Sequence, residues 1–440
     1  MHMVKPVRVL WALGIAVVGL LPLAGVASAN VNDVSTERSG SIVVFPKVVW
    51  DGTRDTIIQI ANTSNAMVHA HCFYVDAAPV DPSQPPSLTN PPQWNETDFD
   101  IWLTRQMPTH WVASLGRSYS AGSGLTNGSL GFFPGLIPPV SQGFIGELKC
   151  VQVDESGAPL RANALKGEAI LRNSAGDVSE YNAIAFQGNP DMTFTSLVCA
   201  AGTATGASCN VDADCGSGGL CDLAQPNDLV LDLTANHVGS YSACPDTLLF
   251  NHFAELSPDD VISQIGTCAP VCVAGPTIGH TCTTNSDCGV GGICGSCPVS
   301  TELTLVPCQE NFEIQQAGTV IVQFLIINEF EQAFSTSTTV NCYMNLPLGL
   351  IGTAGSNSFT LAVLGTASAY SRITPATGNG GVIGVAEEFR SATTSTGTGF
   401  GPKTAAAFNL ETEGNRFDAA TNGKGDSRPG VTDHIIIPQP

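Results

Sequence analysis

Two histidines separated by one residue, His69 and His71, are the residues of this sequence best suited to chemistry. They lie in a short run of Val, Ala, Cys, Phe and Tyr that is typical of a β-strand. On a strand, both imidazoles would project from one face, opposite Cys72. Such a pair can bind Zn²⁺ or Cu²⁺ when a neighbouring strand supplies a third ligand, for which His110 and Asp100 are candidates. The alternative is that both histidines belong to an ordinary polar strand face.

A second candidate is a group of tryptophans, Trp94, Trp102 and Trp111, within 18 residues of one another. Aromatic rings exposed near acidic side chains can stack on sugar rings, so the group gives a carbohydrate-binding hypothesis. The alternative is that the three indoles fill a β-sandwich core, because aromatic side chains contribute most when they are buried.

Motifs of common enzyme classes are missing from the sequence. It contains no G-x-S-x-G, S-x-x-K, H-E-x-x-H, P-loop or dinucleotide-binding glycine motif. No catalytic or cofactor-binding residue is therefore predicted, and a non-enzymatic protein is favoured. A secreted metal-dependent enzyme that uses His69 and His71 is the alternative.

A cysteine pattern occurs twice, at residues 199–221 and 272–294, with the spacing C-x9-C-x5-C-x5-C and 11 of 23 positions identical. A unit this short cannot bury a core, so we expect it to be cross-linked. The three possible pairings within each unit stay open. The cysteines predicted to form disulfides here are Cys199, Cys209, Cys215 and Cys221 in the first unit, and Cys272, Cys282, Cys288 and Cys294 in the second.

Metal binding is the alternative for these units. Cys268 with Cys272, and Cys294 with Cys297, have spacings that are compatible with zinc, but repetition and export favour disulfides. Two acidic turns resemble part of a calcium loop and lack its terminal glutamate, so a simple Asx-type turn is favoured. These turns are Asp212 and Asp214 with Gly216, and Asn285 and Asp287 with Gly289. Calcium and zinc are thus the cofactors left open, and none is predicted.

The first 29 residues have the pattern of a secretory signal peptide. Lys5 and Arg8 precede an apolar stretch that ends at the small-residue cleavage site 27–29. A retained anchor is the alternative. No later run is long enough for a transmembrane helix, so we expect an extracellular, cell-surface or periplasmic protein.

Charge excludes several partners. The 440 residues carry a net charge of −21 with only 17 Lys and Arg, so neither nucleic acid nor an anionic membrane is a plausible ligand. An unknown protein or a glycan remains as the partner. Fifteen cysteines in an oxidising compartment indicate disulfides, and the odd number permits a bond to another chain.

Short strands bounded by Gly, Pro, Asn and Ser predict an all-β fold with two immunoglobulin-like β-sandwiches in tandem and two small inserted cysteine-rich modules. The predicted strands are 41–50, 55–62, 67–75, 99–104, 143–153, 165–172, 180–187, 301–307, 319–327, 338–344, 357–364, 381–389 and 404–411. The predicted divisions are 1–29 (signal peptide), 30–198 (first sandwich), 199–222 (first module), 223–267 (closing strands of the first sandwich), 268–299 (second module) and 300–440 (second sandwich).

A fainter repeat supports the two sandwiches. In both halves a run ending in Pro is followed by a Gln-containing apolar strand, a Cys-aromatic strand and the pattern G-[FV]-I-G. This order predicts a tandem duplication. We expect Cys72 to bond to Cys150 across a sandwich core, and Cys308 to bond to Cys342.

As a whole, the layout resembles uncharacterised secreted bacterial proteins with duplicated β-sandwiches, and the cysteine units resemble short disulfide repeats of extracellular proteins. The resemblance implies no activity and no catalytic residue. The sequence therefore favours an exported, non-enzymatic protein with a structural, adhesive or partner-binding role, with the metal-dependent enzyme and the carbohydrate-binding protein as alternatives.

Overall fold

The computed structural model confirms the all-β prediction: nearly all of its regular structure is antiparallel β-sheet. The predicted signal peptide, Cys209, Cys215, Asp212, Asp214, Cys268 and Cys297 lie outside the described residues. The described residues are 34–81, 90–117, 135–173, 177–188, 197–201, 203, 216–217, 220–223, 228–233, 241–245, 247–255, 257–258, 270–274, 282–290, 293–295, 298–352, 357–376, 379–391, 403–413 and 433–438.

The first half is one sheet that folds over at the β1–β2 hairpin, where Trp50 faces Asp55. One layer contains β4, β3, β6, β1 and β9, and the other contains β5, β2, β7 and β8. Apolar side chains of both layers form a shared core between them. The strands are β1 (Ile42–Trp50), β2 (Arg54–Asn62), β3 (Val68–Asp76), β4 (Asn95–Leu103), β5 (Pro108–Val112), β6 (Phe144–Val153), β7 (Leu165–Asn173), β8 (Val178–Asn182) and β9 (Ile184–Phe186).

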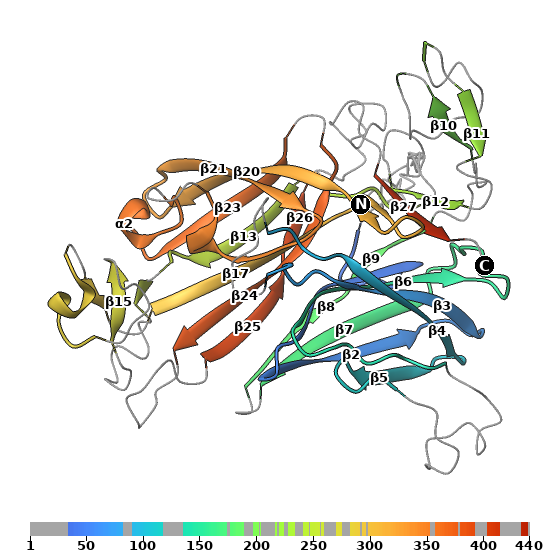
Figure 1. The fold of residues 1–440 in the computed structure, drawn as a ribbon, viewed down its shortest axis with the longest axis horizontal. Coiled ribbons are helices and arrows are strands. Elements are labelled where there is room, and N and C mark those ends of the chain that lie inside the picture. The colour runs from blue at the N-terminus through green and yellow to red at the C-terminus, as the bar shows by residue number, and fades with distance from the viewer. Residues whose placement is uncertain are drawn as a thin grey trace, which may run out of the picture.

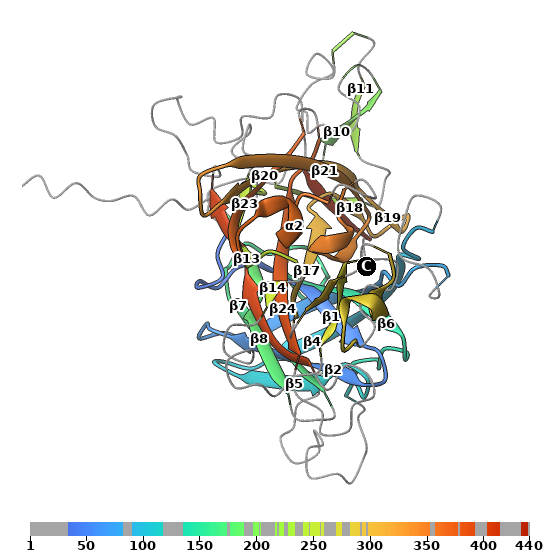
Figure 2. The same cartoon turned by 90° about the vertical axis from the view of Figure 1, so that its left-hand side faces the viewer.

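The second half contains two sheets around a separate core. One has the order β21-β20-β23-β13-β26, and the other has the order β14-β17-β24-β25 with β22 paired to β17. Figure 2 shows the first of these sheets above the strands of the first half. The strands are β13 (Thr247–Phe253), β14 (Ser257–Pro258), β17 (Pro298–Pro307), β20 (Thr319–Asn328), β21 (Ala333–Asn341), β22 (Met344–Pro347), β23 (Ser368–Pro375), β24 (Val382–Ser391), β25 (Lys403–Asn409) and β26 (Glu411–Glu413).

A small third sheet lies between the halves. Its order is β12-β27-β18-β19, formed by Asp228–Asp232, His434–Pro438, Glu310–Asn311 and Gln316–Ala317. It packs against the outer face of β1, β3 and β6 and closes a central core with residues of both halves. Because β1 and β6 are thus covered on both faces, almost every residue in them is buried.

One correction concerns a domain boundary and another concerns a predicted strand. The segment 223–267 was expected to close the first sandwich, but β13 pairs with β23 and β26 of the second half. The strand expected at 357–364 is instead a turn followed by the short helix α2 (Leu361–Leu364), which ends at Gly365 with a φ of +70°. Glycine favours this left-handed conformation because it has no Cβ, so the helix stops there.

The disulfides confirm one expected pairing and correct another. Cys72 and Cys150 are bonded, but they face each other on the neighbouring strands β3 and β6. The bond therefore cross-links one layer and does not join two layers as in an immunoglobulin core. Cys308 is bonded to Cys244, so its expected bond to Cys342 is wrong. Cys342 has a φ of +64° at the end of β21, and Cys244 reaches Cys308 inside the central core.

The two cysteine-rich modules share a backbone register. In the first, β10 (Leu197–Ala201) pairs with β11 (Leu220–Leu223), and Cys199 faces Cys221. In the second, β15 (Val271–Ala274) pairs with β16 (Ile293–Gly295), and Cys272 faces Cys294. Both hairpins have an irregularity one residue after the first cysteine. Figure 1 shows the two hairpins at separate ends of the molecule, outside the large sheets.

A buried lysine of β1 joins the halves. Lys47 Nζ lies 2.5 Å from Glu302 Oε2 and 2.6 Å from Glu387 Oε2, in β17 and β24. Arg54 Nη1 also donates to Glu387 Oε2, at 3.0 Å. Burial alone would raise the pKa of Glu302, but the nearby Lys47 and Arg54 bring it below its ordinary value. This cluster places two basic groups of the first half against two carboxylates of the second.

A second buried lysine, Lys149, connects the first half to the third sheet. Lys149 of β6 is ion-paired with Glu310 of β18, and its Nζ lies 3.6 Å from Glu147 Oε2. All three side chains are almost completely removed from solvent. Burial lowers the pKa of Lys149 and raises that of Glu147, since the interior disfavours each charged form.

No helix in the described part of the chain combines the length and the apolar character that a membrane crossing requires.

Candidate functional site on β3 and β4

Strand alternation divides β3 into a core face and an outer face. Val68, Ala70 and Cys72 are buried in the core of the first half, whereas His69 and His71 are half-buried on the outer face. The prediction that both imidazoles lie on one side of the strand, opposite Cys72, is therefore confirmed. The third sheet covers the outer face over β1, β6 and the second part of β3, but leaves His69, His71 and the outer side of β4 partly exposed.

β4 supplies acidic partners for both histidines because its residues alternate in phase with those of β3. Trp102 faces His69, and Asp100 faces His71, in the antiparallel register. The carboxylates lie diagonally, so that His69 Nε2 is 2.8 Å from Asp100 Oδ1 and His71 Nε2 is 3.2 Å from Asp98 Oδ2. Two parallel His–Asp pairs thus cross the exposed strands.

The surroundings of His69 favour its imidazolium form. Its Nδ1 lies 2.9 Å from the carbonyl oxygen of Asp154, and its Nε2 faces the Asp100 carboxylate, so both nitrogens must donate. Burial alone would lower the pKa of His69, but the hydrogen bonds to Asp100 and Asp154 raise it above its ordinary value. The ring also stacks on Trp102 with centroids 3.8 Å apart and an interplanar angle of 5°, which places a cation on an aromatic face.

His71 has a different environment. Its ring stacks on Phe73 with centroids 4.5 Å apart, and Phe73 in turn stacks on Phe312, which follows β18. Asp98 orients the imidazole through Nε2. The row of rings therefore runs from the open surface into the central core between the two halves.

Glu96 forms the boundary between the open surface and this core. Burial, with the nearby carboxylates Asp98 and Glu313, raises the pKa of Glu96 to about 7. One of its carboxylate oxygens is buried and has no hydrogen-bond donor in the described part of the chain. Glu96 is therefore a carboxyl group of this surface whose pKa burial brings toward neutral pH.

This geometry does not fit the predicted metal site. A metal ligand must offer a lone pair, and both nitrogens of His69 already face acceptor oxygens, the Asp154 carbonyl and the Asp100 carboxylate. His110 lies in β5 opposite Gln59, on the outer face of the other layer, and cannot approach His69 or His71. Of the two proposed third ligands, the structure brings Asp100 alone to the histidines, where it binds a proton-bearing nitrogen.

The tryptophans are mostly core residues. Trp111 is buried in the first half, where its Nε1 donates to Tyr74 Oη at 2.6 Å, and Trp94 is buried against Phe312. Neither can stack on a sugar. Trp102 is partly exposed, but His69 covers one face of its ring. The structure does not bring the three indoles together into an exposed aromatic platform.

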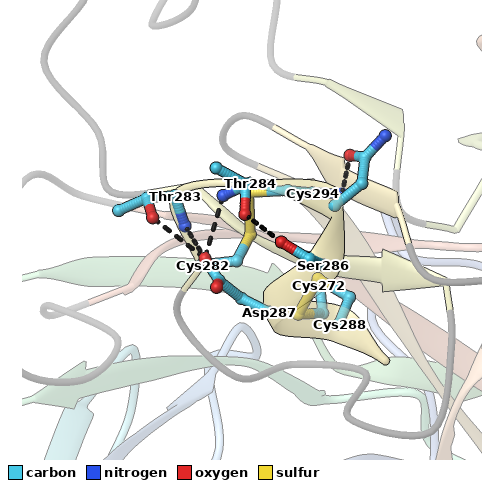
Figure 3. The surroundings of a disulfide bond; sticks show 9 residues. Cys272, Cys282, Thr283, Thr284, Ser286, Asp287, Cys288 and Cys294 are labelled. Atoms are coloured by element: carbon cyan, nitrogen blue, oxygen red, sulfur yellow. Dashed lines mark hydrogen bonds between the residues drawn. A yellow bond between two sulfur atoms is a disulfide. The ribbon is translucent and has the colours of Figure 1, made fainter. Parts of the chain in front are cut away.

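The second module has its own local network, drawn in Figure 3. Cys272 is bonded to Cys288, and Cys282 is bonded to Cys294, so the first cysteine pairs with the third and the second with the fourth. Three of these sulfurs lie close enough together to hold a metal ion, but each already belongs to a disulfide. The zinc alternative therefore fails for Cys272 and Cys294.

The calcium alternative fails in the same module. Asp287 Oδ2 accepts hydrogen bonds from the backbone and hydroxyl of Thr283 and from the backbone of Thr284. These hydrogen bonds lower the pKa of Asp287 to about 2. Asn285 Oδ1 accepts from the backbone of Cys294 at 2.8 Å. The oxygens that would bind calcium instead hold the turn between two disulfides, as expected for an Asx-type turn.

Comparisons with known proteins leave the site to be judged on its geometry. No family model and no curated protein matches the chain. Among solved structures, a reconstruction of the human norovirus GI.7 Houston strain virus-like particle aligns over 92% of this chain and 81% of that chain, with 8% identity and a TM-score of 0.13. A likeness at this level carries no argument.

Proposed function

We propose that the protein is an exported, non-enzymatic binding or assembly protein, in which the two sandwiches form a scaffold and the cysteine-rich modules display binding surfaces. The observation that carries the proposal is the second module. It is a hairpin cross-linked twice within 23 residues, and it lies outside the large sheets. A rigid loop on a rigid body loses little conformational entropy on binding, which is the usual arrangement for recognition.

The body has the properties of a scaffold. Buried ion pairs and a shared core connect the halves, so the positions of attached loops are fixed relative to one another. The four described disulfides favour an oxidising compartment outside the cytoplasm. Export through the signal peptide 1–29 remains part of the proposal.

The metal-dependent enzyme is a weaker alternative because both ring nitrogens of His69 already face acceptor oxygens and His110 is remote. The carbohydrate-binding alternative is weaker because Trp94 and Trp111 are buried. The outer face of β3 and β4 is better explained as a charged surface whose protonation depends on pH.

The proposal is tested by exchanging the second module, residues 272–294, for a Gly-Ser linker of equal length. Fluorescently labelled intact protein should bind to the surface of the cells that export it, and the exchanged variant should lose most of that binding. The circular dichroism spectrum of the sandwiches should stay the same in both. Equal binding by the two proteins, or no binding by the intact protein, would overturn the proposal.

A further inference from the structure

β21 is the outermost strand of a five-stranded sheet, and among the described strands it pairs only with β20. The two strands are in continuous register from Ile327 opposite Ala333 to Thr319 opposite Asn341, without a bulge. Figures 1 and 2 place β21 at the upper edge of the second half. Its outer edge therefore presents a long, regular row of backbone groups.

Other edge strands of this molecule are protected against pairing, and β21 is not. β4 carries Glu96, Asp98 and Asp100, and β26 carries an exposed Glu411. Charges of this kind keep edge strands from pairing with other chains. By contrast, β20 and β21 together contain no Asp, Glu, Lys, Arg or Pro. In a chain with a net charge of −21, a second copy can approach these strands without meeting like charges on the strands themselves; the nearest carboxylates in the sequence are Glu329 and Glu331, in the turn that joins the strands.

The sequence of β21 is complementary to itself in the antiparallel direction. If Ser337 lies on a two-fold axis, Thr336 faces Thr338, Ser335 faces Thr339, and Phe334 faces Val340 of the other copy. Hydroxyl pairs and aromatic–β-branched pairs are both favourable across antiparallel strands. A hollow of about 280 Å³ lies beside the second part of β21, between Ser337, Thr338 and Thr339 on one side and residues that include Pro92, Leu350 and Gly352 on the other.

We propose that β21 pairs antiparallel with β21 of a second copy, centred on Ser337, to form a closed two-fold dimer. The dimer would join two five-stranded sheets into one sheet and would use up both exposed edges. A two-fold contact of this kind is self-limiting, so it gives a dimer and no fibre.

The test compares two lysine substitutions by light scattering after gel filtration, across a dilution series of the purified protein. Ser337→Lys would place two ammonium groups at the two-fold axis. Gln323→Lys is the matched control, because Gln323 is also exposed and lies directly opposite Ser337, but on β20, which has a neighbour on each side. We expect the native protein and the control to have twice the mass of one chain, and Ser337→Lys to dissociate at least about tenfold more readily.

A disulfide cross-linking experiment tests the proposed register of the two β21 strands. In Ser337→Cys, oxidation should produce a covalent dimer on a non-reducing gel, whereas Gln323→Cys should stay at the mass of one chain. Unchanged circular dichroism would show that each variant is folded. A monomeric native protein, a Ser337→Lys variant that dimerises as well as the control, or a folded Ser337→Cys variant that does not cross-link would overturn the proposal.

Discussion

Lys47 shows how single residues connect the two halves. Its ammonium group is fully removed from water, and its nearest partners are carboxylates on the other half of the molecule. A buried charge is tolerated only when partners replace its hydration, and Glu302 and Glu387 do so. The pair of charges therefore stabilises one relative position of the halves over others.

Replacing Lys47 by Met is expected to lower the free energy of unfolding by about 3–5 kcal/mol, because Glu387 would stay buried with fewer positive partners. Urea denaturation monitored by tryptophan fluorescence measures this change. Lys166→Met is the control: Lys166 is only partly buried, and its Nζ donates to the carbonyl of Glu37, so the expected change is within about 0.5 kcal/mol. Equal effects of the two substitutions would contradict a structural role for Lys47.

The raised pKa of His69 predicts how the stability of the fold changes with pH. Its folded-state pKa is raised, so its contribution to stability is fully present below its ordinary pKa of about 6.5 and is lost as the pH rises through the folded-state value. The hydrogen bond to His69 lowers the pKa of Asp100, so the same pair is lost again in acid. The pair is thus strongest in mildly acidic solution.

Asp100→Asn should remove about 0.2–1 kcal/mol of stability near pH 5.5 and less near pH 8.5, the modest size reflecting the exposed Asp100 side chain. It should also lower the pKa of His69, which an NMR titration of its imidazole would measure. Glu180→Gln makes the same charge change at an exposed position on β8 and should leave that pKa unaltered. An unchanged His69 pKa in Asp100→Asn would disprove the assigned ion pair.

At the scale of strands, the local residue pattern is sufficient to predict which segments form strands, but not which strands pair with one another. The apolar run of β1 and the alternation in β3 predicted both strands almost to their ends. β13 was assigned to the wrong half because its seven residues contain no information about β23, which follows more than a hundred residues later. In the site, Asp100 was named as a partner of the histidines, whereas Asp98 depended on a register that long-range packing determines.

The shared hairpin register of the modules predicts their bonds. Because Cys199 faces Cys221 as Cys272 faces Cys294, we expect the first module to pair in the order seen in the second. Cys199 should then bond to Cys215, and Cys209 to Cys221. Mass spectrometry of proteolytic fragments under non-reducing conditions would identify these pairs, with the second module as the internal standard. Any other connectivity would show that the two repeats fold differently.

At the scale of the whole molecule, one layer of the first half serves two cores. The inner face of β1, β3 and β6 packs in the first sandwich, and their outer face packs against the third sheet and residues of the second half. A strand from the middle of the chain also pairs directly with one near residue 440, since β12 lies beside β27. Neither half can lose its strands without exposing apolar surface of the other.

The molecule is therefore expected to unfold as one cooperative unit. Differential scanning calorimetry should show a single transition whose calorimetric enthalpy equals the van't Hoff enthalpy, although chains with two sandwiches commonly unfold in steps. Lys47→Met should move this transition to lower temperature without dividing it, because the cores still share β1 and β6. Two separate transitions in the native protein, each with part of the enthalpy, would mean that the central core and its ion pairs contribute little to stability.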